Sequence, residues 1–384
     1  MNFPASYNNI FERLRFTIVL FILVILSCPT HLALAKGIVV LHSEDGPTPW
    51  TQGIIAGLAS ELGKGTEIRQ EHLGGEDMKE EHFDSEYERL SRVHANTRPE
   101  AVVASGKIAF AFMRKYRETL FSDAPVVFCS MPRPGPELLR QCGDCTGVPL
   151  DMDVSDTVDL IFATRPDTRL VVGIMDATPI SLSLRKSMEQ AMTPYLDHAQ
   201  LIFPGHEPGD NKGLDMETLD AVASSIPTSG AVLFLGFQED RTGKTVDDVK
   251  AVKMLSEQSA GPVFVLLDTW IGQGVLGGFV ATGKNQGSSA AKLIKRILAG
   301  EPAGEMLPQP PQPQLVVDAT VLARFGIQTQ NIPLLQTAQL VNKPVRPAET
   351  DTITSSGILS AALGLVTLAA LLFLLRRLTC RKCT

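Results

Sequence analysis

Short apolar runs alternate with longer amphipathic segments from residue 36 to about residue 347. The runs are hydrophobic at consecutive positions, which is typical of strands in a sheet that helices cover on both faces. The longer segments have the length of helices and carry their charges on one side. We predict strands at 37–43, 101–105, 125–129, 170–174, 199–203, 231–235, 262–267 and 315–318, and helices at 50–62, 84–94, 108–121, 181–195, 216–225, 246–256, 288–298 and 320–326.

This alternation predicts an α/β protein with doubly wound parallel sheets, because parallel strands need crossover connections. The patterned segment exceeds the ~100–200 residues usual for one domain, so we expect two lobes with a hinged cleft between them. Glycine and proline interrupt the pattern at 142–153, where we place the boundary. The first lobe is expected to comprise about 36–130 and, after a return crossing, 280–345, and the second about 150–275.

The first 35 residues have the features of a secretory signal peptide. Residues 16–27 form an uncharged run behind Arg13 and Arg15 that is too short to span a hydrocarbon core of ~30 Å comfortably. Ala33-Leu34-Ala35 follows with the small-x-small pattern of a cleavage site, so we expect cleavage before Lys36. An uncleaved signal anchor and a lipoprotein box at Cys28 are the alternatives.

A second membrane signal lies near the C-terminus. Residues 357–375 contain no charge and, as a helix, would be about one hydrocarbon thickness long. Four basic residues follow within 376–384, so the positive-inside rule predicts a short cytoplasmic tail. A Pro-rich and polar juxtamembrane tether is expected at 348–356. We therefore predict a single-pass protein of the bacterial inner membrane with its body at 36–347 in the periplasm or outside the cell.

The charge distribution supports this topology. The formal net charge is −7, with +1 in the first 35 residues and +4 in the last nine, so the segment between them carries −12. An acidic body is atypical of a nucleic-acid-binding protein, which usually presents a basic face. We therefore expect no nucleic acid among the partners.

A set of short motifs follows one another along the body: His42-Ser43 through Pro49-Trp50-Thr51, Gly57, 125–129, 146–148, 165–169, 268–274, Gly277-Gly278, 283–287 and 297–301. In this order they resemble the extracytoplasmic sensor and substrate-binding family related to ABC-transporter binding proteins, which has the periplasmic-binding-protein type I architecture. Such domains commonly stand at the N-terminus of bacterial membrane histidine kinases. Glu44 and Asp45 depart from the family, which more often places aromatic or imidazole side chains there.

In open α/β sheets ligands bind beyond the carboxyl ends of the strands, so residues that follow the predicted strands are the candidate ligand contacts. An indole there could stack on a ligand, a hydroxyl beside a helix N-terminus could hold an anion, and carboxylates with an amide would suit an amine or a polyol. For each residue a purely structural role in packing or capping is the alternative. The candidates are Ser43, Glu44, Trp50, Ser105, Gly106, Ser130, Asp176, Gln238 and Asp268.

Cys142 and Cys145 form a CxxC motif in an oxidising compartment, where a local disulfide between the lobes is expected in preference to free thiols or redox catalysis. His72, His82 and His94 lie in an acidic segment at intervals that do not share a helix face, so we predict no metal site. The sequence contains neither a GxSxG motif nor a paired-carboxylate motif that would indicate catalysis. We expect neither a cofactor nor an enzymatic activity.

These features predict a membrane-anchored protein that closes on a small molecule of unknown class and signals through its transmembrane helix. The partner could be a membrane kinase, a cyclase or a second copy of the chain. The alternatives are a tethered substrate-binding component that serves an ABC permease, and the sensor fragment of a split or truncated histidine kinase.

Overall fold

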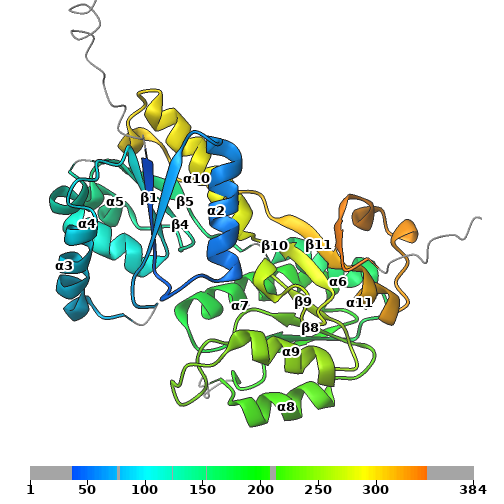
Figure 1. Ribbon diagram of the computed structural model, residues 1–384. Coiled ribbons are helices and arrows are strands. Elements are labelled where there is room, and N and C mark those ends of the chain that lie inside the picture. The colour runs from blue at the N-terminus through cyan, green and yellow to red at the C-terminus, as the bar shows by residue number, and fades with distance from the viewer. Residues whose placement is uncertain (1–36, 76–77, 123, 153, 208–212, 344–384) are drawn as a thin grey trace, which may run out of the picture. The chain divides into compact units, whose positions relative to one another are not determined.

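The computed structural model describes residues 37–75, 78–122, 124–152, 154–207 and 213–343. These residues form two sheets with helices packed on both faces (Figure 1). The predicted signal peptide, transmembrane span and cytoplasmic tail lie outside the described residues. Within the described ranges, no helix is both long and apolar enough to cross a membrane.

The first sheet is parallel throughout and has the strand order β2-β1-β3-β4-β5. Its strands are β1 (Gly37–His42), β2 (Glu67–His72), β3 (Ala101–Ser105), β4 (Val126–Cys129) and β5 (Cys145–Val148). Its helices are α2 (Pro49–Leu62), α3 (Phe83–Val93), α4 (Lys107–Phe121), α5 (Pro136–Cys142) and α10 (Gly283–Leu298).

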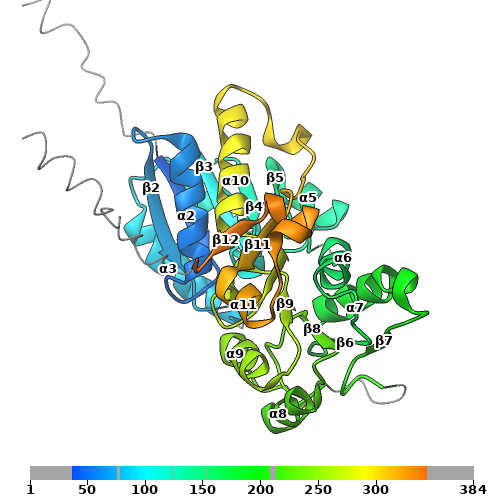
Figure 2. The same ribbon diagram turned by 90° about the vertical axis from the view of Figure 1, so that its right-hand side faces the viewer.

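Alternate side chains of the first sheet enter two separate apolar layers. Val39, Val102 and Val126 pack with α3, α4 and α5, whereas Val40 and Val103 pack with α2 and α10. Helices α2 and α10 lie side by side in both views (Figures 1 and 2). Their backbones meet at glycines: a Cβ on Gly57 would overlap the backbone of α10, so this contact requires residues without side chains.

The second sheet has the strand order β12-β11-β10-β9-β8-β6-β7. It is parallel except for the antiparallel pair β10–β11. Its strands are β6 (Leu170–Ile174), β7 (Gln200–Ile202), β8 (Gly230–Phe234), β9 (Val263–Val265), β10 (Gly277–Val280), β11 (Gln314–Asp318) and β12 (Gln339–Val341). Its helices are α6 (Ser155–Thr164), α7 (Pro179–Ala191), α8 (Met216–Ser225), α9 (Asp248–Gln258) and α11 (Ala319–Arg324).

The chain returns to the first sheet with α10 alone. We expected the whole segment 280–345 in the first lobe, but β11 pairs with β10 and β12 pairs with β11, both in the second sheet. The first sheet in turn extends past the expected limit of residue 130, because β5 pairs with β4. Backbone pairing partners, which the hydrophobic pattern does not identify, decide both differences.

Candidate functional site

Four polar side chains stand in one row at the carboxyl edge of the first sheet. Strands β2, β1, β3 and β4 end at His72, His42, Ser105 and Cys129. In the strand register His42 faces both His72 and Ser105, and Ser105 faces Cys129. Register partners point to the same face of a sheet. Because Val40 lies two residues before His42 and packs with α2 and α10, the row lies on that face.

Three of these side chains keep buried polar atoms without a hydrogen-bond partner. They are both ring nitrogens of His42, Nδ1 of His72 and Oγ of Ser105. The two imidazole rings stack with their centroids 5.0 Å apart. A buried polar group without a partner costs about 1–3 kcal/mol, and native structures satisfy most such groups. A cluster of them at the ends of parallel strands is the arrangement expected of a ligand site.

Burial also decides the charge state of this row. Removal from water, and secondarily the neighbouring His72, lower the pKa of His42 to about 4, so its imidazole is neutral near pH 7. Burial raises the pKa of the Cys129 thiol to about 12, so this cysteine is a protonated, inert side chain. The row therefore offers the neutral imidazole of His42 and the hydroxyl of Ser105 for hydrogen bonding, and no thiolate nucleophile.

Ser43 and Gly106, two of the predicted contacts, shape the start of α4. The Ser43 hydroxyl donates to the carbonyl oxygen of Ser105 (3.0 Å) and accepts from the backbone N–H of Ala109 (3.1 Å). It therefore caps α4 from a neighbouring strand. Gly106 has a φ of 92°, a left-handed conformation that favours glycine, and its N–H donates to the carbonyl oxygen of Cys129 (2.9 Å).

Trp50 and Ser130, both predicted contacts, are bonded to each other. The indole N–H of Trp50 donates to Oγ of Ser130 (2.9 Å), and the backbone N–H of Ser130 donates to Oε1 of Gln286 (3.0 Å). Ser130 has a φ of 59°, which is uncommon for a residue with a side chain. These bonds tie the starts of α2 and α10 to the end of β4. Glu44 is partly buried and lies close enough to Cys129 to contribute to its raised thiol pKa.

At the second sheet, Asp176 follows β6, and both of its carboxylate oxygens accept hydrogen bonds from the protein. Its Oδ1 accepts from the N–H (3.0 Å) and the hydroxyl (2.6 Å) of Thr178, and its Oδ2 accepts from the N–H of Gln238 (2.9 Å). The side chain of Gln238, which follows β8, is exposed. The two predicted contacts thus join the ends of β6 and β8 through bonds within the protein.

Asp268, which follows β9, differs from Asp176. Its Oδ1 is buried without a hydrogen-bond partner, and burial raises the pKa of its carboxyl to about 6, although the N–H of Gly283 bonds the carboxylate. Gly283 begins α10 and packs against the backbone of Trp50. Asp268 therefore lies next to the start of α2, where Trp50 contacts the row through Ser130.

A disulfide joins Cys142 and Cys145, whose Cα atoms are 5.8 Å apart. We expected it in a loop between the lobes, but Cys142 ends α5 and Cys145 begins β5, so it belongs to the first sheet. Among the described residues, no group of three or more His, Cys, Asp and Glu side chains is placed to hold a metal ion.

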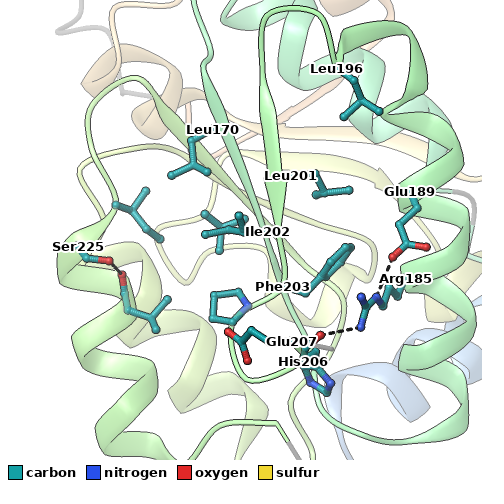
Figure 3. A pocket seen from close by; sticks show the side chains of 14 residues that line it. Leu170, Arg185, Glu189, Leu196, Leu201, Ile202, Phe203, His206, Glu207 and Ser225 are labelled. Carbon is teal, nitrogen blue, oxygen red and sulfur yellow. Dashed lines mark hydrogen bonds and ion pairs between the residues drawn. The ribbon is translucent and has the colours of Figure 1, made fainter. Parts of the chain in front are cut away.

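A cavity of about 630 Å³ lies elsewhere, beside the edge strand β7 (Figure 3). Arg185 in its wall bonds Glu189 (2.9 Å) and the carbonyl oxygen of His206 (3.0 Å), whereas Glu207 accepts from the N–H of Gly205 (3.3 Å) and Nδ1 of His206 is buried without a hydrogen-bond partner. None of the predicted contacts lines it. Its lining residues are Leu170, Val172, Arg185, Glu189, Leu196, Leu201, Ile202, Phe203, Pro204, His206, Glu207, Val222, Ser225 and Ile226.

His42 and His72 were not among the predicted ligand contacts. We placed His72 in an acidic segment without a site, and His42 entered only through the resemblance. The available signal was position, because His42 follows the buried run Ile38–Leu41 directly. His72 had no such signal, since β2 (EIRQEH) is a polar edge strand that the hydrophobic pattern does not mark.

Solved structures resemble this arrangement of sheets. An ABC domain in complex with L-Trp from Streptococcus pneumonia matches with a TM-score of 0.54 and 18% identity, over 80% of this chain and 99% of that chain. A substrate binding protein with adhesive properties from Clostridium difficile matches with a TM-score of 0.55 and 12% identity, over 80% and 100%. A conserved domain protein from Vibrio cholerae matches with a TM-score of 0.52 and 16% identity, over 80% and 99%.

The fold is of the periplasmic-binding-protein type I kind. The two-sheet α/β architecture predicted from the sequence is thereby confirmed. No family model matches the chain, and no curated protein matches it either. At these identities the likeness concerns the fold alone, so function has to be argued from the site.

Proposed function

We propose that this chain binds a small molecule at the carboxyl edge of its first sheet and catalyses no reaction. The observation that carries the proposal is the row of buried polar atoms without partners on His42, His72 and Ser105. A ligand that bonds these atoms recovers the free energy that their burial costs. Two solved structures of this fold are described as binding L-Trp and as a substrate binding protein, which supports this reading.

The further proposal is that the body stands outside the cytoplasm on a single membrane span and signals to a partner protein by closing on its ligand. It is supported by the signal-peptide pattern at 1–35, by the uncharged run 357–375 and by the basic residues that follow it. A tethered component that delivers solute to an ABC permease is the second candidate, favoured by the substrate-binding description of a protein with this fold.

The binding test uses the full-length chain in detergent and a panel of amino acids, nucleobases, sugars, polyamines and organic acids. A ligand at 100 times its dissociation constant should stabilise the fold by about 2.7 kcal/mol, a readily visible thermal shift. Ser105→Ala should abolish the shift. Ser225→Ala makes the same chemical change at an exposed position at the end of α8 and should preserve the shift.

Intrinsic fluorescence supplies a second readout, because the chain has two tryptophans. Trp50 adjoins the site, whereas Trp270 is buried in the second sheet's core. A ligand should change the fluorescence of Trp270→Phe, where Trp50 remains, and not that of Trp50→Phe. A ligand that binds Ser105→Ala undiminished would place the site elsewhere, and a panel without any binder would contradict the proposed function.

The topology can be tested with native thiols. Cys380 and Cys383 lie in the predicted cytoplasmic tail, whereas Cys129 is buried and Cys142 is bonded to Cys145. A membrane-impermeant maleimide should therefore label the tail only after the cells are broken. Cys380→Ser/Cys383→Ser should remove that labelling. Labelling of these thiols in intact cells would contradict the proposed orientation.

A further inference from the structure

From the unpaired atoms of His42 and of the neighbouring Asp268, which follows β9 of the second sheet, we infer that the ligand carries a protonated amine, which these two side chains accept. The inference rests on the proposed function and deepens it by naming the chemical class of the ligand. It follows from three features of the edge: the sign of its charges, the hydrogen-bonding capacity of its neutral groups and the place of Trp50 between them.

Two carboxylates lie beside the start of α2 and the end of β4. Asp268 has a buried oxygen without a hydrogen-bond partner beside the start of α10, and Glu44 lies close to Cys129 at the end of β4. The nearest basic residues along the chain, Lys107 in α4 and Lys284 in α10, are exposed. A buried carboxylate is stabilised by an opposite charge at hydrogen-bond distance, so this edge favours a cation over an anion.

The imidazoles favour the same class of ligand. A neutral imidazole has one nitrogen that accepts a hydrogen bond and one that donates. An ammonium group has three N–H donors and no acceptor, so it can donate to the accepting nitrogen of the neutral His42 imidazole. Burial, and secondarily the neighbouring His72, lower the pKa of His42 to about 4, so its ring, stacked 5.0 Å from that of His72, keeps a nitrogen that can accept.

Trp50 connects the two parts of the edge. Its indole N–H is already donated to Ser130, so the remaining interaction it offers a ligand is its π face. The residue is partly exposed and stands beside Gly283, to which Asp268 is bonded. An aromatic face next to a carboxylate suits an organic cation, which the ring quadrupole attracts.

The cavity beside β7 is the weaker candidate for an amine. Its Glu189 is paired with Arg185, whose guanidinium also lies 4.8 Å from the ring of Phe203. Its second carboxylate, Glu207, is exposed and accepts from the N–H of Gly205 (3.3 Å), and Nδ1 of His206 is buried without a hydrogen-bond partner. Because water already stabilises an exposed carboxylate, a cation gains less beside Glu207 than beside the buried oxygen of Asp268.

The test compares matched compounds on the full-length chain by calorimetry and thermal shift. One set is 1,4-diaminobutane, 1,4-butanediol and succinate, which share four carbons and differ in charge. The other is L-leucine, leucinol and 2-hydroxy-4-methylpentanoate, which separate the amine from the carboxylate. We expect binding in at least one set to require the amine, with the amine-free members at least tenfold weaker. The same comparison is made for any binder found in the broad panel, against its analogue lacking the amine.

Asp268→Asn keeps an acceptor for the N–H of Gly283 and removes the charge, so the fold should be retained while amine affinity falls at least tenfold. His42→Gln should also weaken binding. Asp197→Asn, a matched change at an exposed carboxylate of the second sheet, should not. A binder that is indifferent to the amine or to Asp268→Asn would overturn this inference and leave the proposed function standing. The absence of any binder, in the sets and the broad panel alike, would overturn both.

Discussion

Buried polar side chains at the carboxyl ends of the two sheets differ in whether their hydrogen bonds are completed within the protein. At the ends of β6 and β8, the carboxylate of Asp176 accepts three hydrogen bonds from Thr178 and Gln238. At the ends of β1 and β3, His42 and Ser105 are equally buried, yet their side-chain polar atoms have no partner. The first arrangement holds a loop in place, and the second leaves bonding capacity for another molecule. A polar residue after a strand thus indicates a ligand contact only when its bonds are not completed within the protein.

Ser43 and Ser105 show the same contrast at closer range. Both hydroxyls are buried, and the Ser43 hydroxyl donates to the carbonyl oxygen of Ser105. Ser43 makes two hydrogen bonds and caps α4, whereas the Ser105 hydroxyl makes none. Substitutions at these positions can therefore measure the difference between a structural residue and a candidate ligand contact.

Asp176→Ala should have the largest effect. It removes an acceptor of three hydrogen bonds and leaves the N–H groups of Thr178 and Gln238 without a partner, which should lower the free energy of unfolding by about 3–5 kcal/mol. Urea unfolding of the full-length chain in detergent measures this loss. An unchanged midpoint of urea unfolding would mean that the hydrogen bonds of Asp176 at the end of β6 do not stabilise the fold.

Acid should destabilise the protein through His42. Its folded pKa of about 4 lies below the ordinary value of 6.5, so between these pH values the unfolded chain binds more protons. The free energy of unfolding should therefore fall as the pH drops from 6.5 to 4, by about 3 kcal/mol for a shift of this size. His42→Leu should flatten this slope in unfolding measured across the pH range.

The raised pKa of Asp268 acts in the opposite direction, because the folded chain then holds its proton more tightly between pH 6 and pH 3.8. The slopes of His42→Leu and its parent are therefore best compared when both proteins also carry Asp268→Asn, because the contribution of Asp268 is then absent. If His42→Leu and its parent show the same slope there, the imidazole is not buried in the neutral form.

The smallest effects come from the two serines. Ser43→Ala should cost about 1–2 kcal/mol, because α4 loses its cap. Ser105→Ala should change stability by less than about 0.5 kcal/mol, because the hydroxyl it removes lies beside the Cys129 thiol, a weak hydrogen-bonding group, and makes no stronger bond. Thermal unfolding of the two variants side by side checks the difference. Equal destabilisation would show that Ser105 is structural after all.

Much of the fold follows from the sequence. The buried strands from β1 to β9 were predicted wherever the chain is apolar at consecutive positions, as at 101–105 and 231–235. Four strands, β2, β5, β10 and β12, were not predicted, and two of these omissions have a clear physical reason. The edge strand β2 is only partly buried and consists mainly of polar residues, so it has no apolar run. The strand β5 (CTGV) is short and follows a glycine turn at Gly143.

The candidate site was predicted only in outline. The rule that ligands bind at carboxyl ends of strands selected Ser105 and Asp268, which keep unpaired atoms, but also Ser43 and Asp176, which do not. The local sequence does not distinguish the residues with unpaired atoms, Ser105 and Asp268, from those without, Ser43 and Asp176. Whether a side chain is satisfied depends on partners that are distant along the chain, such as Ala109 for Ser43 and Gln238 for Asp176.

The sequence by itself determined the class of fold, the alternation of strands and helices and the patterns that mark both ends of the chain, because these depend on the period and length of hydrophobic runs. Only the tertiary structure decided that β11 and β12 join the second sheet, that His42 stacks on His72, and which polar atoms stay without partners. Strand pairing brings together residues far apart along the chain, so the chemistry of the edge exists only once the sheet has formed.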